Sequence, residues 1–293
     1  MHVGFVGTGN MGLPMARNIL KAGHQLTVWD VRPEATAELE QLGATRAPDL
    51  KSLAQAVRVT CTSLPNDEIV QAVVAGQSGR EGLLAGARPG DVIFDLSTVS
   101  PASTKRLASR ALEGGVRLID APVSGSVSGA AAGTLAVMIG ATTEVAGPYE
   151  SVLKAIGTSL FYLGEVGRGN MLKLLNNLVA LSNQVALCEA MALADRLGVP
   201  RQMVGDVIGK SSGASFILER KLAAIVKHDY RPGFFVDLAH KDLGLALDLA
   251  AETGARADLV KQARQLYAEA SKAGFGKMDS SGVLAMLEPK PRT

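Results

Sequence analysis

HVGFVGTGNMG, residues 2–12, is the stretch that decides the fold. Its first part, His2–Val6, is a short apolar run without helical periodicity, which predicts a buried strand. A helical pattern follows from Leu13 to Ala22, so the glycines in between form a G-x-G-x-x-G pattern between a strand and a helix. In this motif the glycines permit a tight turn, approach of the backbone to a pyrophosphate, and close packing of helix on strand. The sequence therefore predicts a dinucleotide-binding loop at a helix N-terminus rather than a glycine-rich turn of another α/β unit, with the residues Gly7, Gly9, Asn10, Met11 and Gly12.

The second predicted strand, Gln25–Trp29, ends on an acid, Asp30. An acid at this place accepts hydrogen bonds from the hydroxyl groups of the adenosine ribose. A 2′-phosphate would meet a like charge there, so Asp30 favours NAD. Arg32 complicates this expectation because its guanidinium could pair with a phosphate, although it could also lie exposed or stack on the adenine. We expect both residues to bind the cofactor, with NAD preferred and NADP possible.

Alternation of strands and helices continues through the first half. Further strands are expected at residues 57–64, 91–96, 116–120 and 134–139, with helical stretches between most of them. This order predicts an α/β fold of the Rossmann type, a doubly wound parallel sheet with helices on both faces. Ligands of such sheets bind beyond the carboxyl ends of the strands. We therefore expect contacts with the cofactor from Leu64, Pro65 and Thr98, although Pro65 could be turn punctuation and Thr98 a helix N-cap.

A segment of small residues, Asp120–Ala130, follows one of these strands. Small side chains leave backbone N–H groups uncovered, and successive free N–H groups form an anion site. A substrate carboxylate would fit there, with the Ser124 hydroxyl as an extra donor. The alternative is a flexible serine and glycine loop.

A long helical stretch opens at the glycine-flanked turn Gly167–Gly169 and runs to Arg196. It is apolar almost all round, so it is either buried or spans a membrane. Charged residues at both ends leave no clean apolar run of about 20 residues, which predicts a buried helix. Within it, Lys173 and Asn177 are four residues apart and share one face. A lysine on an apolar helix is costly unless it is paired, desolvated for a purpose or close enough to the helix start to reach water.

The second half lacks the alternation of the first. Helices separated by Gly, Pro and Ser are expected at residues 201–208, 215–226, 235–254 and 258–274. We therefore expect two domains, a dinucleotide-binding domain of residues 1–164 and an all-helical domain of residues 165–293 that is joined to it by the long helix.

Composition excludes several classes of function. The 293 residues are 47% hydrophobic and 20% charged with a net charge of +2, which favours neither nucleic acid nor a membrane surface as partner. Cys61 and Cys188 are isolated and lack metal-like spacing, so we expect no metal and a reducing, cytoplasmic location.

Four motifs together resemble the β-hydroxyacid dehydrogenase family, which includes 3-hydroxyisobutyrate dehydrogenases and tartronate semialdehyde reductases. They are GxGxMG at Gly7–Gly12, DAPVSG at Asp120–Gly125, GxGxxxKxxxN at Gly167–Asn177 and KDLxLA at Lys241–Ala246. The match runs nearly end to end, so it is far more specific than any one motif.

The resemblance implies an active site between a Rossmann domain and a helical domain, and assembly into homodimers or homotetramers. It implies that Lys173 is catalytic, that Asn177 helps to hold a small anionic substrate, and that Lys241 lies near the nicotinamide. It also implies that the substrate carboxylate binds at Ser124, Gly125 and Ser126. Many members have SGG here, so the hydroxymethyl group of Ser126 is a departure that could alter which substrates fit.

These residue types suit hydride transfer between a nicotinamide and a short β-hydroxy acid. Neutral Lys173 would take the hydroxyl proton as the hydride leaves, and charged Lys173 would return it in the reverse direction. A free lysine titrates near 10.4, so desolvation and nearby cations must lower its pKa for this role. The substrate stays open among 3-hydroxyisobutyrate, glycerate, L-serine, 4-hydroxybutyrate and sulfonate analogues. The alternatives are an imine reductase, which often lacks the lysine, and a non-catalytic reader module on the same fold.

Overall fold

The computed structural model describes residues 1–77, 79–231 and 233–288. The chain divides into two compact units, Met1–Lys173 and Leu174–Thr293, and each is described here by itself. One continuous helix, α9 (Arg168–Arg196), runs through the point of division. The domain boundary expected near residue 164 stays a prediction.

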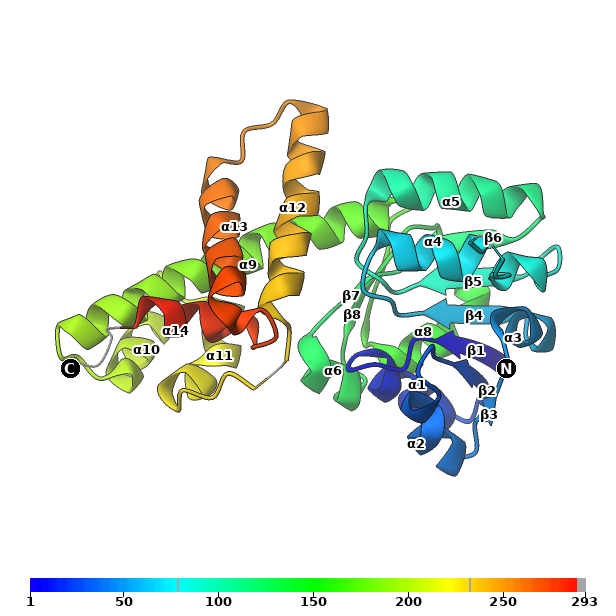
Figure 1. Ribbon diagram of the computed structural model, residues 1–293, viewed down its shortest axis with the longest axis horizontal. Coiled ribbons are helices and arrows are strands. Elements are labelled where there is room, and N and C mark those ends of the chain that lie inside the picture. The colour runs from blue at the N-terminus through cyan, green and yellow to red at the C-terminus, as the bar shows by residue number, and fades with distance from the viewer. Residues whose placement is uncertain (78, 232, 289–293) are drawn as a thin grey trace. The chain divides into compact units, whose positions relative to one another are not determined.

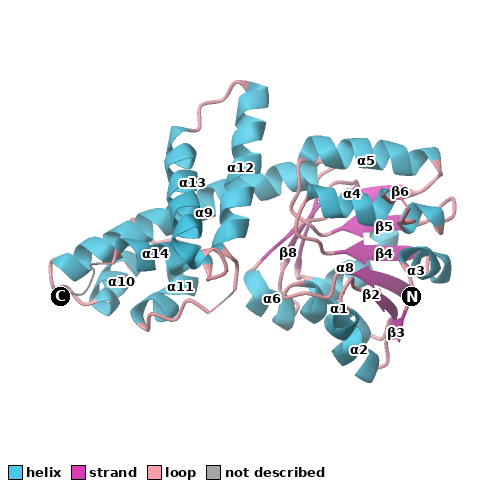
Figure 2. Cartoon of the chain, viewed as in Figure 1, coloured by secondary structure: helices cyan, strands magenta, loops and turns pink. Residues whose placement is uncertain are grey.

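A six-stranded parallel sheet organises the first unit, with the strand order β3-β2-β1-β4-β5-β6 (Figures 1 and 2). The first strand, β1, lies in the middle of the sheet, and later strands are added on both sides of it, as in a doubly wound dinucleotide-binding fold. The strands are β1 (His2–Val6), β2 (Gln25–Trp29), β3 (Thr45–Arg46), β4 (Val59–Thr62), β5 (Val92–Asp95) and β6 (Arg117–Asp120).

Helices cover both faces of this sheet because neighbouring residues of each strand point to opposite sides. Phe5 packs in one core cluster with α1 (Gly12–Lys21) and α8 (Glu150–Ile156). Val6 packs in another with the helices α3 (Leu50–Ala56), α4 (Asp67–Ala75) and α5 (Pro101–Glu113). The short helices α2 (Ala37–Gln41) and α7 (Thr143–Ala146) complete the connections. The expected α/β Rossmann fold is therefore confirmed.

A second, three-stranded sheet has the order β7-β8-β9. Its strands are β7 (Val123–Ser124), β8 (Ala136–Ile139) and β9 (Ser159–Tyr162), and β7 runs antiparallel to β8. Of these, only β8 was expected from the sequence. The small-residue segment is consequently not one flexible loop, because it holds β7 and the first turns of helix α6 (Ser126–Ala132).

The described part of the second unit contains only helices as regular elements (Figure 2). Its core includes the buried Met191, Leu243 and Tyr267. The helices α12 and α13 lie side by side in Figure 1. The helices after α9 are α10 (Arg201–Gly209), α11 (Phe216–Val226), α12 (Val236–Thr253), α13 (Asp258–Ala270) and α14 (Val283–Leu287). The expected all-helical second part is therefore confirmed.

The long helix α9 is buried on part of its circumference only. Leu174, Leu181 and Met191 are buried, but four large apolar residues are between 41% and 57% exposed, namely Leu172, Leu175, Val179 and Leu193. Their spacing places them on one side of the helix. The prediction of a buried helix therefore holds for one side of α9 and not for the other, because an apolar composition does not say whether each face is covered within the same chain.

Among the described helices, α9 alone is long and apolar enough to cross a membrane by length and composition. However, 56% of its most apolar window is buried inside the protein, as in the core helix of a soluble protein.

Candidate functional site

The glycine loop between β1 and α1 has the geometry of a pyrophosphate cradle. Gly7 has a φ of +89°, and a side chain there would overlap the carbonyl oxygen of Ser63. A side chain at Gly12 would overlap the carbonyl oxygen of Gly7, so both positions require glycine. At Gly9, in contrast, the nearest atom to a Cβ would be on Arg32 at 4.0 Å. The open space at Gly9, at the N-terminus of α1, fits a dinucleotide pyrophosphate.

Asp30 lies against this loop at the end of β2. Its Oδ2 accepts a hydrogen bond from the backbone N–H of Thr8 at 2.8 Å, and its Oδ1 accepts one from the backbone N–H of Arg32 at 2.9 Å. The Arg32 Nε lies 3.5 Å from the same Oδ1, with the Arg32 side chain 61% exposed and that of Asp30 only 7% exposed. Asp30 therefore shapes the glycine loop and holds the arginine that the sequence left ambiguous.

The loops after β4 and β5 are tied to each other at the carboxyl edge of the sheet. The backbone N–H of Leu64 donates to the Ser97 hydroxyl at 2.9 Å. Pro65 is exposed and Thr98 is half-buried. Ser100 is the N-cap of α5, so the alternative that Thr98 caps this helix is wrong.

The Ser124–Ser126 segment turns sharply from β7 into α6. Gly125 has a φ of +138° and Ser126 a φ of +63°. Positive φ is uncommon for a residue other than glycine and marks a backbone that its surroundings hold in place. The Ser126 hydroxyl lies 2.9 Å from that of Ser128. The first N–H groups of a short helix therefore follow directly after Ser124.

Lys173 lies on the second turn of α9 and is 8% exposed, so the alternative that it reaches open water near the helix start is wrong. Asn177, one turn further, is 6% exposed. Its Nδ2 donates to Oδ2 of Asp242 at 2.6 Å, and its Oδ1 accepts from Nδ2 of Asn176 at 3.1 Å. The helix thus carries a buried amine and a buried, fixed amide on one face.

Asp242 is a candidate site residue that the sequence reading missed. It is 2% exposed, and its Oδ1 lies 3.0 Å from Nζ of Lys241. Lys241 and Asp242 are therefore not the surface pair of the alternative reading, since the carboxylate is buried between Lys241 and the Asn177 amide. The only sequence signal was its position beside Lys241, because contact with residue 177 depends on how α9 and α12 pack.

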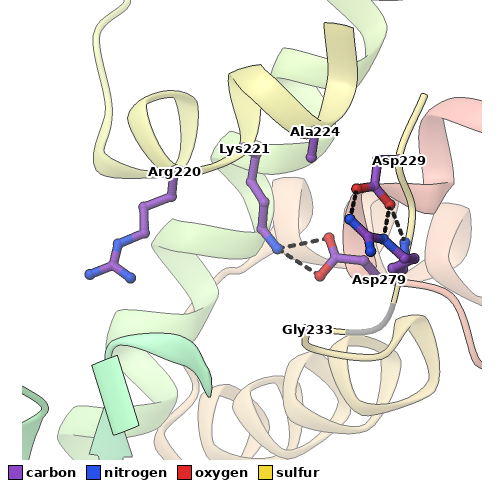
Figure 3. Close-up of a pocket in the computed structure, with 7 residues that line it drawn as sticks. Arg220, Lys221, Ala224, Asp229, Gly233 and Asp279 are labelled. Atoms are coloured by element: carbon purple, nitrogen blue, oxygen red, sulfur yellow. Dashed lines mark hydrogen bonds and ion pairs between the residues drawn. The ribbon is translucent and has the colours of Figure 1, made fainter. Parts of the chain in front are cut away.

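A separate pocket of about 320 Å³ in the helical unit is lined by seven residues (Figure 3), namely Arg220, Lys221, Ala224, Asp229, Arg231, Gly233 and Asp279. Lys221 donates to both oxygens of Asp279 at 2.7 Å, and Arg231 pairs with Asp229 at 2.6 Å. The Arg231 side chain beside Asp229 lowers the pKa of that carboxyl to about 2. Since both carboxylates already have cationic partners and no expected site residue lines this pocket, we assign it no ligand.

Family models match nearly the whole chain. Residues 2–164 match the NAD binding domain of 6-phosphogluconate dehydrogenase. Residues 167–287 match the NAD-binding domain of NADP-dependent 3-hydroxyisobutyrate dehydrogenase.

Characterised relatives give the same family. A 2-(hydroxymethyl)glutarate dehydrogenase from Eubacterium barkeri is 38% identical over 98% of this chain and 95% of its own length. A 3-sulfolactaldehyde reductase from Escherichia coli is 34% identical over 97% of this chain and 95% of its own. The crystal structure of a 3-hydroxyisobutyrate dehydrogenase from Salmonella typhimurium superposes with a TM-score of 0.89 at 32% identity, covering 98% of this chain and 99% of that one. The chain therefore belongs to the 3-hydroxyisobutyrate dehydrogenase family of NAD(P)-dependent β-hydroxyacid dehydrogenases, the family that its motifs resemble.

Proposed function

We propose that Lys173 is the general acid and base of this oxidoreductase, which interconverts a short hydroxy acid and its aldehyde acid. The observation that carries the proposal is the burial of Lys173, 8% exposed on an apolar helix, one turn from the buried amide of Asn177. Buried ionisable groups cluster at functional sites, so a proton-transfer role fits a lysine placed there.

The other expected site residues receive roles that fit their contacts. The glycine loop, with Asn10 and Met11, would hold the pyrophosphate, and Asp30 with Arg32 would hold the adenosine ribose. Leu64, Pro65 and Thr98 would contact the cofactor from the loops after β4 and β5, and Lys241 keeps the role near the nicotinamide that the family resemblance gives it. The ion pair between Lys241 and Asp242 supports a fixed position for that lysine.

When bound, the cofactor supplies the hydride chemistry. In the oxidative direction, neutral Lys173 removes the proton of the substrate hydroxyl, and in the reductive direction its ammonium donates a proton to the carbonyl oxygen. Asn177 uses one N–H of its amide on Asp242, and the second N–H of the amide can hydrogen-bond the substrate oxygen. Asp242 thereby orients the amide without taking part in the proton transfer.

The test is a Lys173→Ala variant in steady-state kinetics with 3-hydroxyisobutyrate, L-serine and glycerate. We expect kcat to fall about 100- to 10,000-fold, the usual contribution of a general acid and base. NADH affinity, measured by fluorescence titration, should change less than about twofold, well below 1 kcal/mol. A variant that keeps more than about a tenth of the wild-type rate would remove Lys173 from this role.

Lys173→Arg is the matched control, because it retains a cation that does not give up its proton near neutral pH. It should be as inactive as Lys173→Ala. Added methylamine should restore part of the activity of the alanine variant only.

We further propose that the substrate carries an acid group, held by the backbone at Ser124, Gly125 and Ser126. The support is the sharp turn into α6 at two residues with positive φ, because turn conformations of the backbone are the kind that form concave anion sites. Hydrogen bonds to a charged group are each worth about 1.5–3 kcal/mol, so methyl esters and amides of the substrate should lose at least about tenfold in kcat/KM. Equal turnover of esters and free acids would contradict this assignment.

We also propose that the enzyme works in the cytoplasm as a homodimer or homotetramer. Support for a reducing location comes from Cys61 and Cys188, which are both free and buried. Burial raises the pKa of each thiol to about 12, so neither is a reactive thiolate. Support for assembly comes from the exposed apolar side of α9.

A further inference from the structure

The first turn of α9 is fixed to the parallel sheet by Asp120, which is fully buried at the end of β6. Its Oδ1 accepts a hydrogen bond from the backbone N–H of Gly167 at 2.7 Å, and its Oδ2 accepts one from the backbone N–H of Asn170 at 2.8 Å. A Cβ on Gly169 would lie 2.8 Å from the same Oδ2. The carboxylate thus satisfies N–H groups at the helix start that would otherwise lack partners.

The side chain of Asn170 makes a second connection from the same turn. Asn170 is fully buried, and its Oδ1 accepts a hydrogen bond from the backbone N–H of Val99 at 3.1 Å. Its Nδ2 donates to the Thr104 hydroxyl on α5 at 3.2 Å. One amide therefore joins α9 to the loop after β5 and to the helix that follows this loop.

These contacts relate the lysine to the loop expected to contact the cofactor. Lys173 is three residues after Asn170, so the two side chains are neighbours on one face of α9. Val99 directly follows Thr98. Three short links connect Lys173 to Thr98. They are one helical turn to Asn170, one buried hydrogen bond from Asn170 to Val99 and one peptide unit from Val99 to Thr98, and each of these is stiff.

We propose that Asn170 is a positioning residue, which holds Lys173 in register with the loop that carries Thr98, so that proton transfer at the substrate oxygen is aligned with hydride transfer at the carbon that bears this oxygen. This inference rests on the proposed role of Lys173. Buried hydrogen bonds that fix a reacting group matter because misplacement by about 1 Å can cost about 100-fold in rate.

The decisive variant is Asn170→Ala, compared with Ser103→Ala as a matched control. Ser103 is also buried and lies on α5 beside Thr104, but its hydroxyl accepts a hydrogen bond from Gln71 rather than from α9. We expect Asn170→Ala to lower kcat about 10- to 100-fold, with NADH affinity nearly unchanged and a larger primary deuterium isotope effect on kcat. A purely structural loss would move the melting temperature of both variants without changing the isotope effect.

Thr104→Val keeps the proposal testable if Asn170→Ala does not fold. It removes the partner of Asn170 Nδ2 and the hydrogen bond from the Thr104 hydroxyl to the Ser100 carbonyl, and it leaves the hydrogen bond from Val99 to Asn170 Oδ1 in place. It should lower kcat less than Asn170→Ala and still raise the isotope effect above that of Ser103→Ala. If the Asn170 and Thr104 variants match Ser103→Ala in kcat and isotope effect, the proposal is wrong.

Hydrogen exchange supplies a readout that does not need turnover. Addition of NAD should slow hydrogen exchange of the amides of residues 170–173 in the wild type. We expect no such slowing in Asn170→Ala and a smaller slowing in Thr104→Val. Absence of slowing in the wild type would overturn the positioning role. An active Lys173→Ala variant would instead overturn the proposed function, so the two failures are distinguishable.

Discussion

Asp30 combines two roles that bear on the choice of cofactor. Its carboxylate holds the Thr8 N–H of the glycine loop and the Arg32 guanidinium. A 2′-phosphate would have to approach this carboxylate and compete with it for Arg32. We therefore predict a preference for NAD over NADP of at least about tenfold in kcat/KM, about 1.4 kcal/mol. We also predict that Asp30→Asn reduces or reverses this preference for NAD, because the amide removes the like charge and releases Arg32 for the 2′-phosphate.

Steady-state kinetics with both cofactors checks this prediction. Arg32→Gln is the control, and it should weaken the use of NADP in the wild-type and Asp30→Asn backgrounds alike. Equal or better use of NADP by the wild type would mean that Arg32 outweighs Asp30.

Ser126 occupies a backbone conformation that favours glycine. With a φ of +63°, its side chain costs about 1–2 kcal/mol, while glycine would lose about 0.4–1 kcal/mol through greater freedom of the unfolded chain. We therefore predict that Ser126→Gly raises the free energy of unfolding by about 0.5–1 kcal/mol, as measured by chemical denaturation. Ser128→Gly, inside α6, should lower this free energy, since glycine disfavours a helix interior. A loss of stability in both variants would show that Ser126 is not strained.

The candidate site residues that the sequence predicted are those that belong to a local motif or to a helical spacing. The sequence missed the candidates whose contacts are made with residues distant along the chain. Helical spacing placed Lys173 and Asn177 on one face, the family resemblance gave them their expected roles, and the glycine loop followed from its motif. Asn170 and Asp242 did not, because their importance comes from Val99 and from Asn177, which are distant in sequence. No periodicity encodes such a contact.

At the scale of elements, periodicity predicted the strands and helices that have a buried face several residues long. The missed strands β3 and β7 contain two residues each, too few for a period to be read, and β9 alternates between exposed and half-buried residues. The expected helix 258–274 ends earlier, since α13 stops at Ala270 and a short π-helical turn, Ser271–Phe275, follows. Gly274 has a φ of +92° there, which an α-helix cannot continue. Local chemistry therefore fixed element types better than their ends.

At the scale of the whole molecule, the side of α9 formed by Leu172, Leu175, Val179 and Leu193 remains uncovered in a single chain, with each residue at least 41% exposed. Fully burying one such side chain stabilises by about 1.5–3 kcal/mol, and a two-fold symmetric contact would bury the set twice. We predict that the wild type is a dimer or tetramer and that Val179→Asp dissociates it, because a charge in an apolar interface is costly.

Light scattering and sedimentation over a range of protein concentrations measure this assembly directly. Aspartate and valine have similar helix propensities, so the variant chain itself should stay folded, which circular dichroism verifies. Leu112→Asp is the control, because Leu112 is 63% exposed on α5 and lies outside the α9 stripe. Its assembly state should equal that of the wild type. A monomeric wild type would contradict the predicted assembly itself. A Val179→Asp variant that stays assembled would mean that the subunits meet at another surface than the apolar side of α9.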